Sequence, residues 1–209
     1  TVPVGTARRL ATRLAEAAPA GHGVELAWNP EFLREGHAVE DTLHPDRLVF
    51  GVHSERGERA LSDVYAPVIG DEVPVVVTDL ETAELVKVAA NAFLATKISF
   101  INAMAEICEV TGADVTKLAD AIGHDARIGR RFLDAGVGFG GGCLPKDIRA
   151  FIARAGEIGA SQALAFLAEV DAVNLRRRER VAEIAREMMG GVVAGKRVAV
   201  LGAAFKPNS

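Results

Sequence analysis

The segment Glu81–Val110 limits the possible folds of this chain more than any other, because its pattern is typical of one long helix that is apolar around most of its circumference. Its apolar and small residues fall on nearly every helical face: Val88, Ala89, Ala90, Phe93, Leu94, Ile98, Phe100, Ile101, Met104 and Ile107. A helix of this kind must be buried on all sides. In a chain of 209 residues we expect another subunit to supply part of that cover, so the segment predicts a homodimer.

The residues before this helix alternate between helical and strand patterns. Helices are predicted over 6–17 and 55–66, and apolar or β-branched strands over 24–28, 48–52 and 73–78. Such alternation is typical of an α/β unit with a largely parallel sheet. Since about three strands are fewer than a usual sheet contains, we expect a partial Rossmann-like sheet followed by an all-helical dimerisation domain with a long central helix.

The residues after the long helix are mainly helical. We expect a short helix capped by Asp114, a second helix beginning near Pro145, a third over 161–189, and a final strand over 197–201. Because a lone terminal strand has no sheet to join, the sequence predicts a piece of a longer protein. Its expected domains are 1–79, 80–194 and 195–209.

The composition narrows the classes of function. The chain has 24 Lys and Arg against 28 Asp and Glu with no basic face, so nucleic acid is not an expected partner. Two cysteines suggest a reducing cytoplasm rather than a disulfide framework. No leader or uninterrupted membrane-spanning apolar run stands out, so no membrane association is expected. The five histidines lack metal-ligand spacing, and no metal is proposed.

The glycine-rich segment Gly136–Asp147 is the strongest indication of chemistry. Pro145 suits the first turn of a helix, which puts Cys143 at the helix N-terminus, where unpaired N–H groups favour a thiolate. Lys146 adds positive charge, and Asp147, one turn along, is a candidate base or water-positioning group. Cys108 lies mid-helix beside Ile107 and is expected to be a core residue.

The same segment contains a false nucleotide-binding signature. Gly136, Gly138 and Gly141 match the G-x-G-x-x-G spacing, but no buried strand precedes them, and that fingerprint requires one. We therefore do not expect this loop to hold a dinucleotide.

Two further groups of polar residues stand in apolar or strand-end positions. Lys87 and Asn91 share one face of the long helix, where burial would require partners, although Lys87 alone could also be a snorkelling side chain. Glu31 and Glu35 follow a predicted strand, where α/β proteins bind ligands. Alone, this second segment would be an ordinary loop.

These segments together resemble the UDP-glucose/GDP-mannose dehydrogenase family over essentially the whole chain. The matching motifs occur in the family's order, and they are Thr1–Gly5, Asn29–Gly36, Lys87-x-x-x-Asn91, Gly138–Cys143 continuing to Asp147, and Val200–Pro207. Any one motif is weak, whereas the ordered set is specific.

The resemblance implies NAD-dependent oxidation of a nucleotide-sugar C6 alcohol to a carboxylate, with Cys143 carrying thiohemiacetal and thioester intermediates. The implied catalytic residues are Cys143, Lys87, Asp147, Glu31, Asn91 and Thr1. The implied substrate contacts are Glu31, Phe32, Leu33, Arg34, Glu35, Lys87, Asn91, Arg127 (reaching across the dimer), Gly136, Val137, Gly138, Phe139, Gly140 and Lys206. The implied contacts with NAD are Thr1, Val2, Glu35, Cys143 and Lys146.

The chain departs from the family pattern at two positions. It has Gly142 where the family usually has serine, and Asp134 where relatives often have lysine or asparagine.

The loop 127–133 favours UDP-glucose as the substrate, and GDP-mannose and UDP-N-acetylmannosamine are the alternatives. A β-hydroxyacid dehydrogenase, which would not need Cys143, and a dimerisation module without activity are the other hypotheses. We also expect the nucleotide-binding glycine turn ahead of Thr1 and the remainder of a UDP-binding domain after Ser209.

Overall fold

The computed structural model describes residues 1–70 and 73–202, which form two compact units. Thr1–Ala90 make up the first unit, and the described residues from Asn91 onward make up the second. The division falls inside α4 (Leu80–Thr111), the long helix predicted over 81–110. A small parallel sheet and long helices confirm the expected α/β class.

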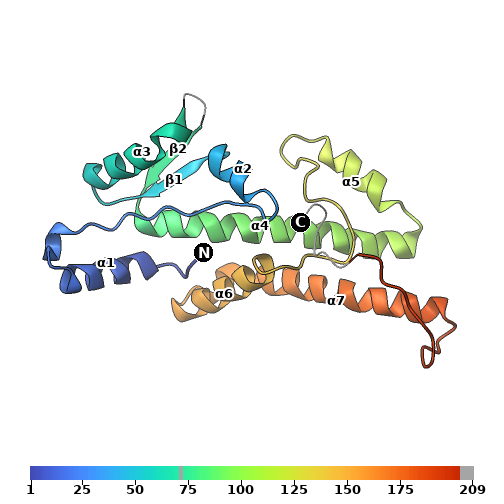
Figure 1. The fold of residues 1–209 in the computed structure, drawn as a ribbon. Helices are drawn as coiled ribbons and strands as arrows, with labels where there is room; N and C mark the ends of the chain where they lie inside the picture. Colours follow the sequence, from blue (N-terminus) through green and yellow to red (C-terminus); the bar gives the residue numbers. More distant parts are fainter. Residues whose placement is uncertain (71–72, 203–209) are drawn as a thin grey trace. The chain divides into compact units, whose positions relative to one another are not determined.

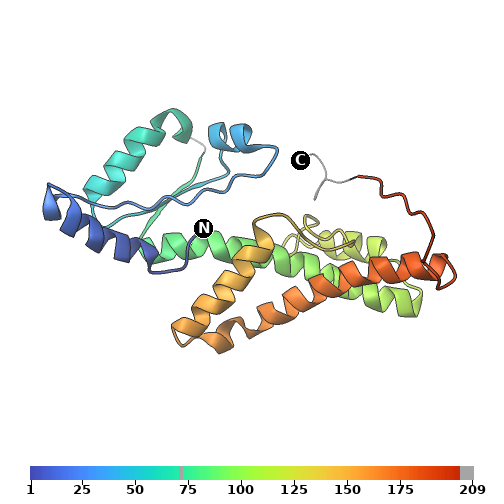
Figure 2. The same ribbon diagram turned by 60° about the horizontal axis from the view of Figure 1, so that its bottom comes forward.

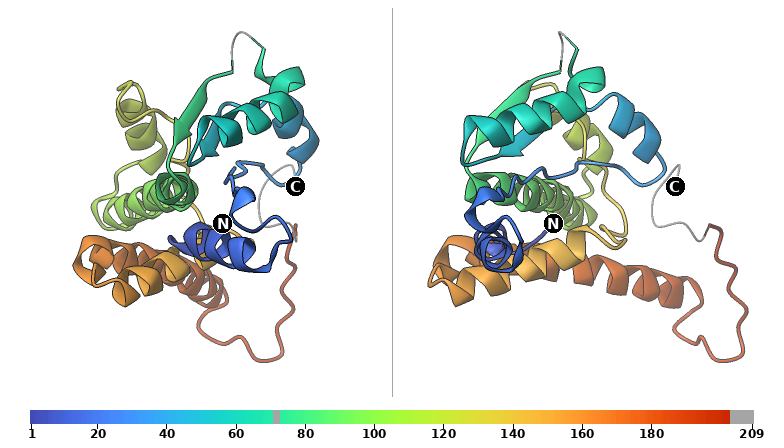
Figure 3. Two further views of the ribbon diagram at one scale, coloured as in Figure 1. Left: turned by 90° about the vertical axis from the view of Figure 1, so that its left-hand side faces the viewer. Right: turned by 60° about the vertical axis from the view of Figure 1, so that its left-hand side comes forward.

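The first unit is built around a parallel β–α–β element (Figure 1). Its elements before α4 are α1 (Thr6–Ala17), the 3-10 turn η1 (Gly21–Gly23), α2 (Ala38–Leu43), β1 (Leu48–Gly51), α3 (Glu55–Ile69) and β2 (Val75–Thr78). The register pairs Leu48 with Val75 and Gly51 with Thr78. All four residues of β1 are buried, the pattern of a parallel strand that is covered on both faces. The crossover helix α3 lies along the sheet (Figure 3) and begins at Ser54, whose hydroxyl accepts the N–H groups of Arg56 and Gly57.

The predicted strand over 24–28 is wrong. Only Trp28 pairs, in an isolated antiparallel bridge to Gly51, at 2.8 and 2.7 Å between backbone N and O atoms. Elsewhere in this segment the Val24 N–H donates to the Gly21 carbonyl at 3.1 Å, and the Glu25 carboxylate accepts the Ser54 hydroxyl at the start of α3. The apolar residues 24–28 therefore contact the edge of β1 at one position but do not form a third strand of the sheet.

The second unit is helical. After α4 come α5 (Val115–Gly123), α6 (Leu144–Glu157), the 3-10 turn η2 (Ser161–Leu164) and α7 (Ala165–Met188). The turn η2 joins α6 and α7 into a helical hairpin (Figure 2). Asp114 caps α5 as predicted, accepting from the N–H groups of Thr116 and Lys117. The predicted helix over 161–189 instead starts with a 3-10 turn.

Two apolar clusters form the core of this unit. The first joins α4, α6 and α7, and its buried members are Ala92, Ala95, Phe139, Ile148, Leu167 and Val170. The second packs α5 and the following loop against α4 through Ile101, Ala119 and Leu133. Small residues on α4 let neighbouring helices approach closely, which places the loop 136–143 directly beside the core.

Burial of α4 on all sides, as expected from its sequence, is wrong for the single chain. Phe93 is 67% exposed, Phe100 49% and Ile107 58%, and these residues recur every seven positions on one helix face. By length and composition alone, α4 is long and apolar enough to cross a membrane, and no other helix in the described part of the chain is. Core helices of soluble proteins meet the same criterion. The dimer as the cover for this face stays a prediction.

The predicted strand over 197–201 is also wrong. These residues adopt no regular structure, and Val200 and Leu201 are exposed, because no neighbouring strand in the described part of the chain offers them backbone partners. Lys206 lies outside the described residues.

Candidate active site

Cys143 immediately precedes α6 and occupies its N-cap position, as the sequence predicted. Its backbone carbonyl accepts the N–H of Asp147 at 2.9 Å, so the first turn of the helix is tied to the cysteine. The side chain of Cys143 is exposed, whereas Cys108 is 5% exposed within the core. Gly141 has a φ of 74°, a left-handed conformation that side chains resist, and this turn directs the chain into the helix.

Asp147 is the buried acid of the second unit, 3% exposed in the first turn of α6. Its Oδ2 accepts a hydrogen bond from Asn91 Nδ2 on α4 at 2.6 Å, and its Oδ1 lies 3.1 Å from Lys146 Nζ. Lys146 itself is 63% exposed. The carboxylate is therefore fixed in orientation beside an accessible thiol-bearing residue, which suits a group that positions water or accepts a proton.

Lys87 is the buried base of the first unit. Its Nζ lies 3.4 Å from Glu31 Oε1, and only 11% of its side chain is exposed. The ammonium also lies 5.4 Å from the centre of the Phe32 ring, on which Arg47 stacks at 4.0 Å. Burial with a carboxylate partner argues against the snorkelling interpretation, because a snorkelling lysine keeps its ammonium in water.

The loop that carries Glu31 is held to the sheet by Tyr65 and by Asn29, the first residue of the motif Asn29–Gly36, and the sequence predicted this anchoring role for neither. Asn29 Nδ2 donates to the carbonyl of Val49 in β1 at 3.0 Å, and Tyr65 Oη donates to Asn29 Oδ1 at 2.5 Å. The only indication of this anchor in the sequence is that Asn29 is a polar residue at the end of an apolar run. Asn29 thus fixes the backbone beside β1, two residues before Glu31.

The far side of this loop is closed by an ion pair between Arg34 and Asp41 of α2. Arg34 donates to both carboxylate oxygens through its side chain and to Oδ2 through its backbone N–H. These hydrogen bonds lower the pKa of Asp41 to about 2. Glu35 and Leu33 are exposed at the tip of the loop.

Thr1 and Val2 precede α1, whose N-terminus is capped from another helix. The Glu84 carboxylate accepts the N–H of Gly5 and of Ala7, each at 2.7 Å, and Glu84 is 2% exposed. Gly5 adopts a φ of 91° and supplies no side-chain cap of its own. This cap could not be predicted from the sequence, because the two partners are separated by nearly eighty positions.

Arg127 and Gly136–Gly140 lie in the loop between α5 and α6. The Arg127 side chain is 89% exposed and pairs with Asp125, whose pKa is lowered by the hydrogen bonds from Arg127. Phe139 is buried in the core, while Val137 is exposed. Asp134, one of the departures from the family pattern, is exposed and pairs with Arg130.

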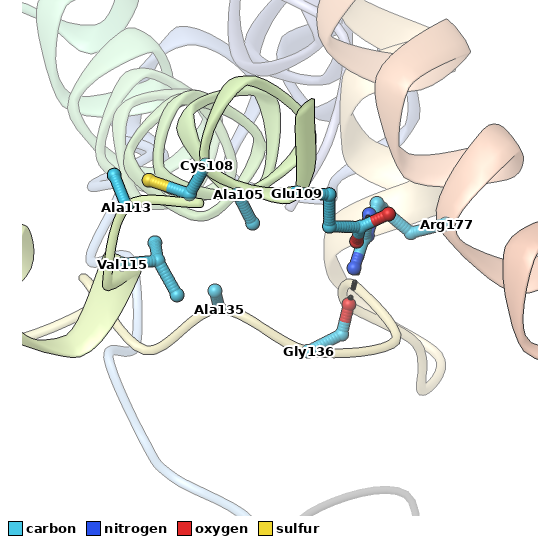
Figure 4. Close-up of a pocket in the computed structure, with 8 residues that line it drawn as sticks. All are labelled: Ala105, Cys108, Glu109, Ala113, Val115, Ala135, Gly136 and Arg177. Atoms are coloured by element: carbon cyan, nitrogen blue, oxygen red, sulfur yellow. Dashed lines mark hydrogen bonds and ion pairs between the residues drawn. The ribbon is translucent and has the colours of Figure 1, made fainter. Parts of the chain in front are cut away.

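A cavity of about 260 Å³ lies on the α4 side of this loop (Figure 4). Cys108 and Gly136 line it, and Arg177 Nε donates to the Gly136 carbonyl at 3.3 Å. Arg177 also donates to Glu109, which lowers the pKa of that carboxyl. Neither Cys143 nor Asp147 lines the cavity, and Gly136 is the one predicted site residue among the residues that line it.

The predicted site residues fall in both units. The first unit holds Thr1, Val2, Glu31–Glu35 and Lys87, and the second holds Asn91, Arg127, Gly136–Gly140, Cys143, Lys146 and Asp147. Within the first unit the structure brings Glu31 and Lys87 together, and within the second it brings both Asn91 and Lys146 to Asp147. No group of three or more potential metal ligands occurs among the described residues.

The helix starts of the first unit offer little room for a dinucleotide diphosphate. A diphosphate needs free N–H groups at a helix N-terminus. In the first unit the start of α1 is filled by the Glu84 carboxylate, and the start of α3 by Ser54 with the Glu25 carboxylate behind it. Two negative charges at these positions would repel phosphate, so this part of the chain does not fit the diphosphate.

Comparison with known proteins identifies the family. Residues 81–176 match the central domain of the UDP-glucose/GDP-mannose dehydrogenase family, and residues 1–69 match the NAD binding domain of the same family. The chain belongs to the UDP-glucose/GDP-mannose dehydrogenase family. The resemblance drawn from the ordered motifs is thereby confirmed, and so is NAD as the cofactor of the domain to which residues 1–69 belong.

Individual relatives share the whole length of the chain. It is 44% identical over 209 residues to UDP-glucose 6-dehydrogenase TuaD of Bacillus subtilis, covering 100% of this chain and 44% of that protein. It is 45% identical over 212 residues to UDP-glucose 6-dehydrogenase AglM of Haloferax volcanii, covering 100% and 48%. The chain therefore spans about half the length of these curated relatives.

A solved relative has the same fold. The structure of a UDP-glucose dehydrogenase from Pyrobaculum islandicum superposes with a TM-score of 0.80 at 41% identity, covering 91% of this chain and 43% of that one.

Proposed function

We propose that the protein carrying this chain oxidises the C6 alcohol of a nucleotide sugar to a carboxylate, with UDP-glucose as the favoured substrate. The observation that carries the proposal is the exposed Cys143 at the N-terminus of α6, one turn from the buried and fixed carboxylate of Asp147. Membership of the family supports it, and so does similarity over the whole of this chain to about half the length of UDP-glucose 6-dehydrogenases.

Cys143 would be the nucleophile. Its sulfur adds to the C6 aldehyde to form a thiohemiacetal, and removal of a second hydride leaves a thioester, which water hydrolyses to the carboxylate and the free thiol. NAD⁺, when bound, accepts one hydride in each oxidation. Covalent attachment prevents release of the aldehyde between the two oxidations.

The fixed polar pairs would handle protons and oxyanions. Asp147, oriented by Asn91, or Glu31 would activate the hydrolytic water. Lys87 would stabilise negative charge on the C6 oxygen, because its ammonium is largely desolvated and acts in a medium of low polarity. Thr1 and Asn91 would hold the water and the substrate oxygen.

The remaining predicted contacts concern binding. Glu31–Glu35, Gly136–Gly140, Lys206 and Arg127, the last from the partner of a homodimer, would hold the UDP-sugar. Val2, Glu35 and Lys146 would face the cofactor. A cytoplasmic enzyme without nucleic-acid or membrane partners fits the reduced cysteines.

Substrate screening tests the proposal. The protein expressed from its complete reading frame is assayed for NADH with UDP-glucose, GDP-mannose and UDP-N-acetylmannosamine, and the product is weighed by mass spectrometry. We expect two NADH for each uronate formed from UDP-glucose. Preference for another sugar would reassign the substrate, and a wild-type protein inactive on all three would refute the proposal.

Two cysteine variants test the mechanism. Cys143→Ala should abolish uronate formation, whereas Cys108→Ala, the matched control in the core, should retain it. Turnover by Cys143→Ala would favour chemistry of the β-hydroxyacid dehydrogenase kind, which needs no thiol.

A further inference from the structure

Asn174 of α7 holds one residue of the glycine loop, Phe139, at both of its backbone polar groups. Its Oδ1 accepts the N–H of Phe139 at 2.7 Å, and its Nδ2 donates to the carbonyl of the same residue at 3.1 Å. Asn174 is 1% exposed, so both hydrogen bonds are made away from water. A buried amide that satisfies a single residue twice fixes its position and its rotation together.

A second buried asparagine holds the loop from the opposite helix. Asn102 of α4 is fully buried, and its Oδ1 accepts the N–H of Gly136 at 2.9 Å while its Nδ2 donates back to Ile98. Arg178 adds a hydrogen bond to the Phe139 carbonyl at 2.8 Å. The loop is therefore anchored at 136 and at 139, from two helices.

Steric fit at Gly138 couples the loop to the same asparagine. Gly138 has a φ of 89°, and a Cβ at this position would overlap Asn174 Oδ1. The Phe139 ring is buried against Ile148 and Leu167, so the loop cannot move away from Asn174 without opening the core. Four residues later the chain reaches the exposed Cys143.

We propose that Asn174 and Asn102 are positioning residues that set the backbone of Gly136–Gly140 for the nucleotide sugar. This inference rests on the proposed function, in which that loop contacts substrate. Neither asparagine touches the reacting atoms. Each acts through the loop, and a binding loop displaced by about 1 Å can lose about a hundredfold in rate.

The test compares three variants in the protein expressed from its complete reading frame. Asn174→Leu has similar volume and loses both hydrogen bonds, whereas Asn174→Asp keeps the acceptor for the Phe139 N–H and loses the donor to its carbonyl. Ser99→Ala is the matched control, because Ser99 is also buried and donates from α4 to the Val170 carbonyl of α7 without touching the loop.

Both Asn174 variants should raise KM for UDP-glucose, by about tenfold for leucine, with KM for NAD⁺ unchanged. A purely structural defect would lower the active fraction, and hence kcat, without moving one KM selectively. Ser99→Ala should leave both constants as in the wild type. If Asn174→Leu does not fold, Asn174→Asp tests the proposal in the same way, through a rise in KM for UDP-glucose with KM for NAD⁺ unchanged.

Hydrogen exchange at the Phe139 amide gives a readout that does not depend on turnover. We expect slow exchange in the wild type and in Ser99→Ala, and faster exchange in the Asn174 variants. Unchanged exchange or an unchanged sugar KM in a folded Asn174 variant would overturn the inference. A wild type that is inactive on every nucleotide sugar but keeps the slow amide would refute the proposed function and leave the anchor itself intact.

Discussion

Replacing Glu84 with alanine removes both acceptors that its carboxylate offers to the start of α1. The N–H groups of Gly5 and Ala7, each 2.7 Å from a carboxylate oxygen, would lose this partner, and Ala7 is fully buried. Hydrogen bonds to a charged group contribute about 1.5–3 kcal/mol each. Part of this gain is offset in the wild type by burial of the carboxylate itself, and loss of an N-cap costs up to about 2 kcal/mol.

The expected net destabilisation of the first unit is therefore about 2–3 kcal/mol. For a chain of this size, that corresponds to a fall in Tm of about 4–12 °C. Thermal unfolding followed by circular dichroism, repeated with urea, measures the change. Glu84→Gln should lie between wild type and alanine, because one amide oxygen remains as an acceptor while the NH₂ group faces an N–H.

Glu81→Ala is the matched control on the same helix. Glu81 pairs with Arg8 of α1 at 2.7 Å without hydrogen-bond geometry, and the Arg8 side chain is 72% exposed. The Arg8 end of this pair lies in water, although the Glu81 side chain is only 28% exposed. A pair with one end in water contributes no more than about 1 kcal/mol, so this variant should lower Tm less than Glu84→Ala. Equal shifts for the two variants, or a loss below about 1 kcal/mol for Glu84→Ala, would refute the argument that the buried cap stabilises α1.

Cys143 should be alkylated by iodoacetamide faster than Cys108, since only Cys143 is exposed, and peptide mass mapping that finds equal labelling would reject the assignment. Phe100→Asp should convert the expected homodimer to a monomer in sedimentation, because Phe100 lies on the exposed apolar face of α4, and a monomeric wild type would contradict the dimer. Asp41 should titrate near pH 2 by NMR, because its pKa is lowered by Arg34. The contact with Arg34 therefore stabilises the fold fully above the unfolded pKa of about 3.9, and this stabilisation is lost as the pH falls through about 2. A titration midpoint near 3.9 would show that the pair does not form. The 209-residue chain alone should produce no NADH from UDP-glucose, because carboxylates already occupy the starts of α1 and α3 and leave no place there for a diphosphate. Turnover within about tenfold of the product of the complete reading frame would show that the chain can position the cofactor.

The helices could be predicted from sequence because their signals are local. The limits of α1 and α4, and the cap that Asp114 places on α5, follow from periodicity and short-range hydrogen bonding. The strands were less predictable, since an apolar run such as 24–28 becomes a strand only when a neighbouring edge accepts its backbone groups. That neighbour is set by tertiary structure.

Some residues of the candidate site could likewise be predicted from the sequence, and others could not. Cys143, Asp147 and Lys87 could be named because reactive residue types stood in unusual surroundings along the chain. Asn29, Glu84 and Asn174 could not, because each acts on a segment distant in sequence: β1, the start of α1 and the glycine loop. Polar residues in a helix or a loop look alike in sequence whether they face water or hold a backbone amide.

The glycine loop combines features that oppose each other in most loops. Glycines reduce side-chain packing and leave backbone N–H groups open to a ligand, but they also raise the conformational entropy lost on ordering. Here the buried Phe139 ring and the two asparagines supply the order that the glycines lack. Backbone can thus stay exposed at 141 and 142 and still lead to Cys143 at the start of α6. A glycine-rich loop with this support can bind a ligand through its backbone without ordering first, which is the condition for rapid and repeatable positioning of a sugar carbon against a thiol.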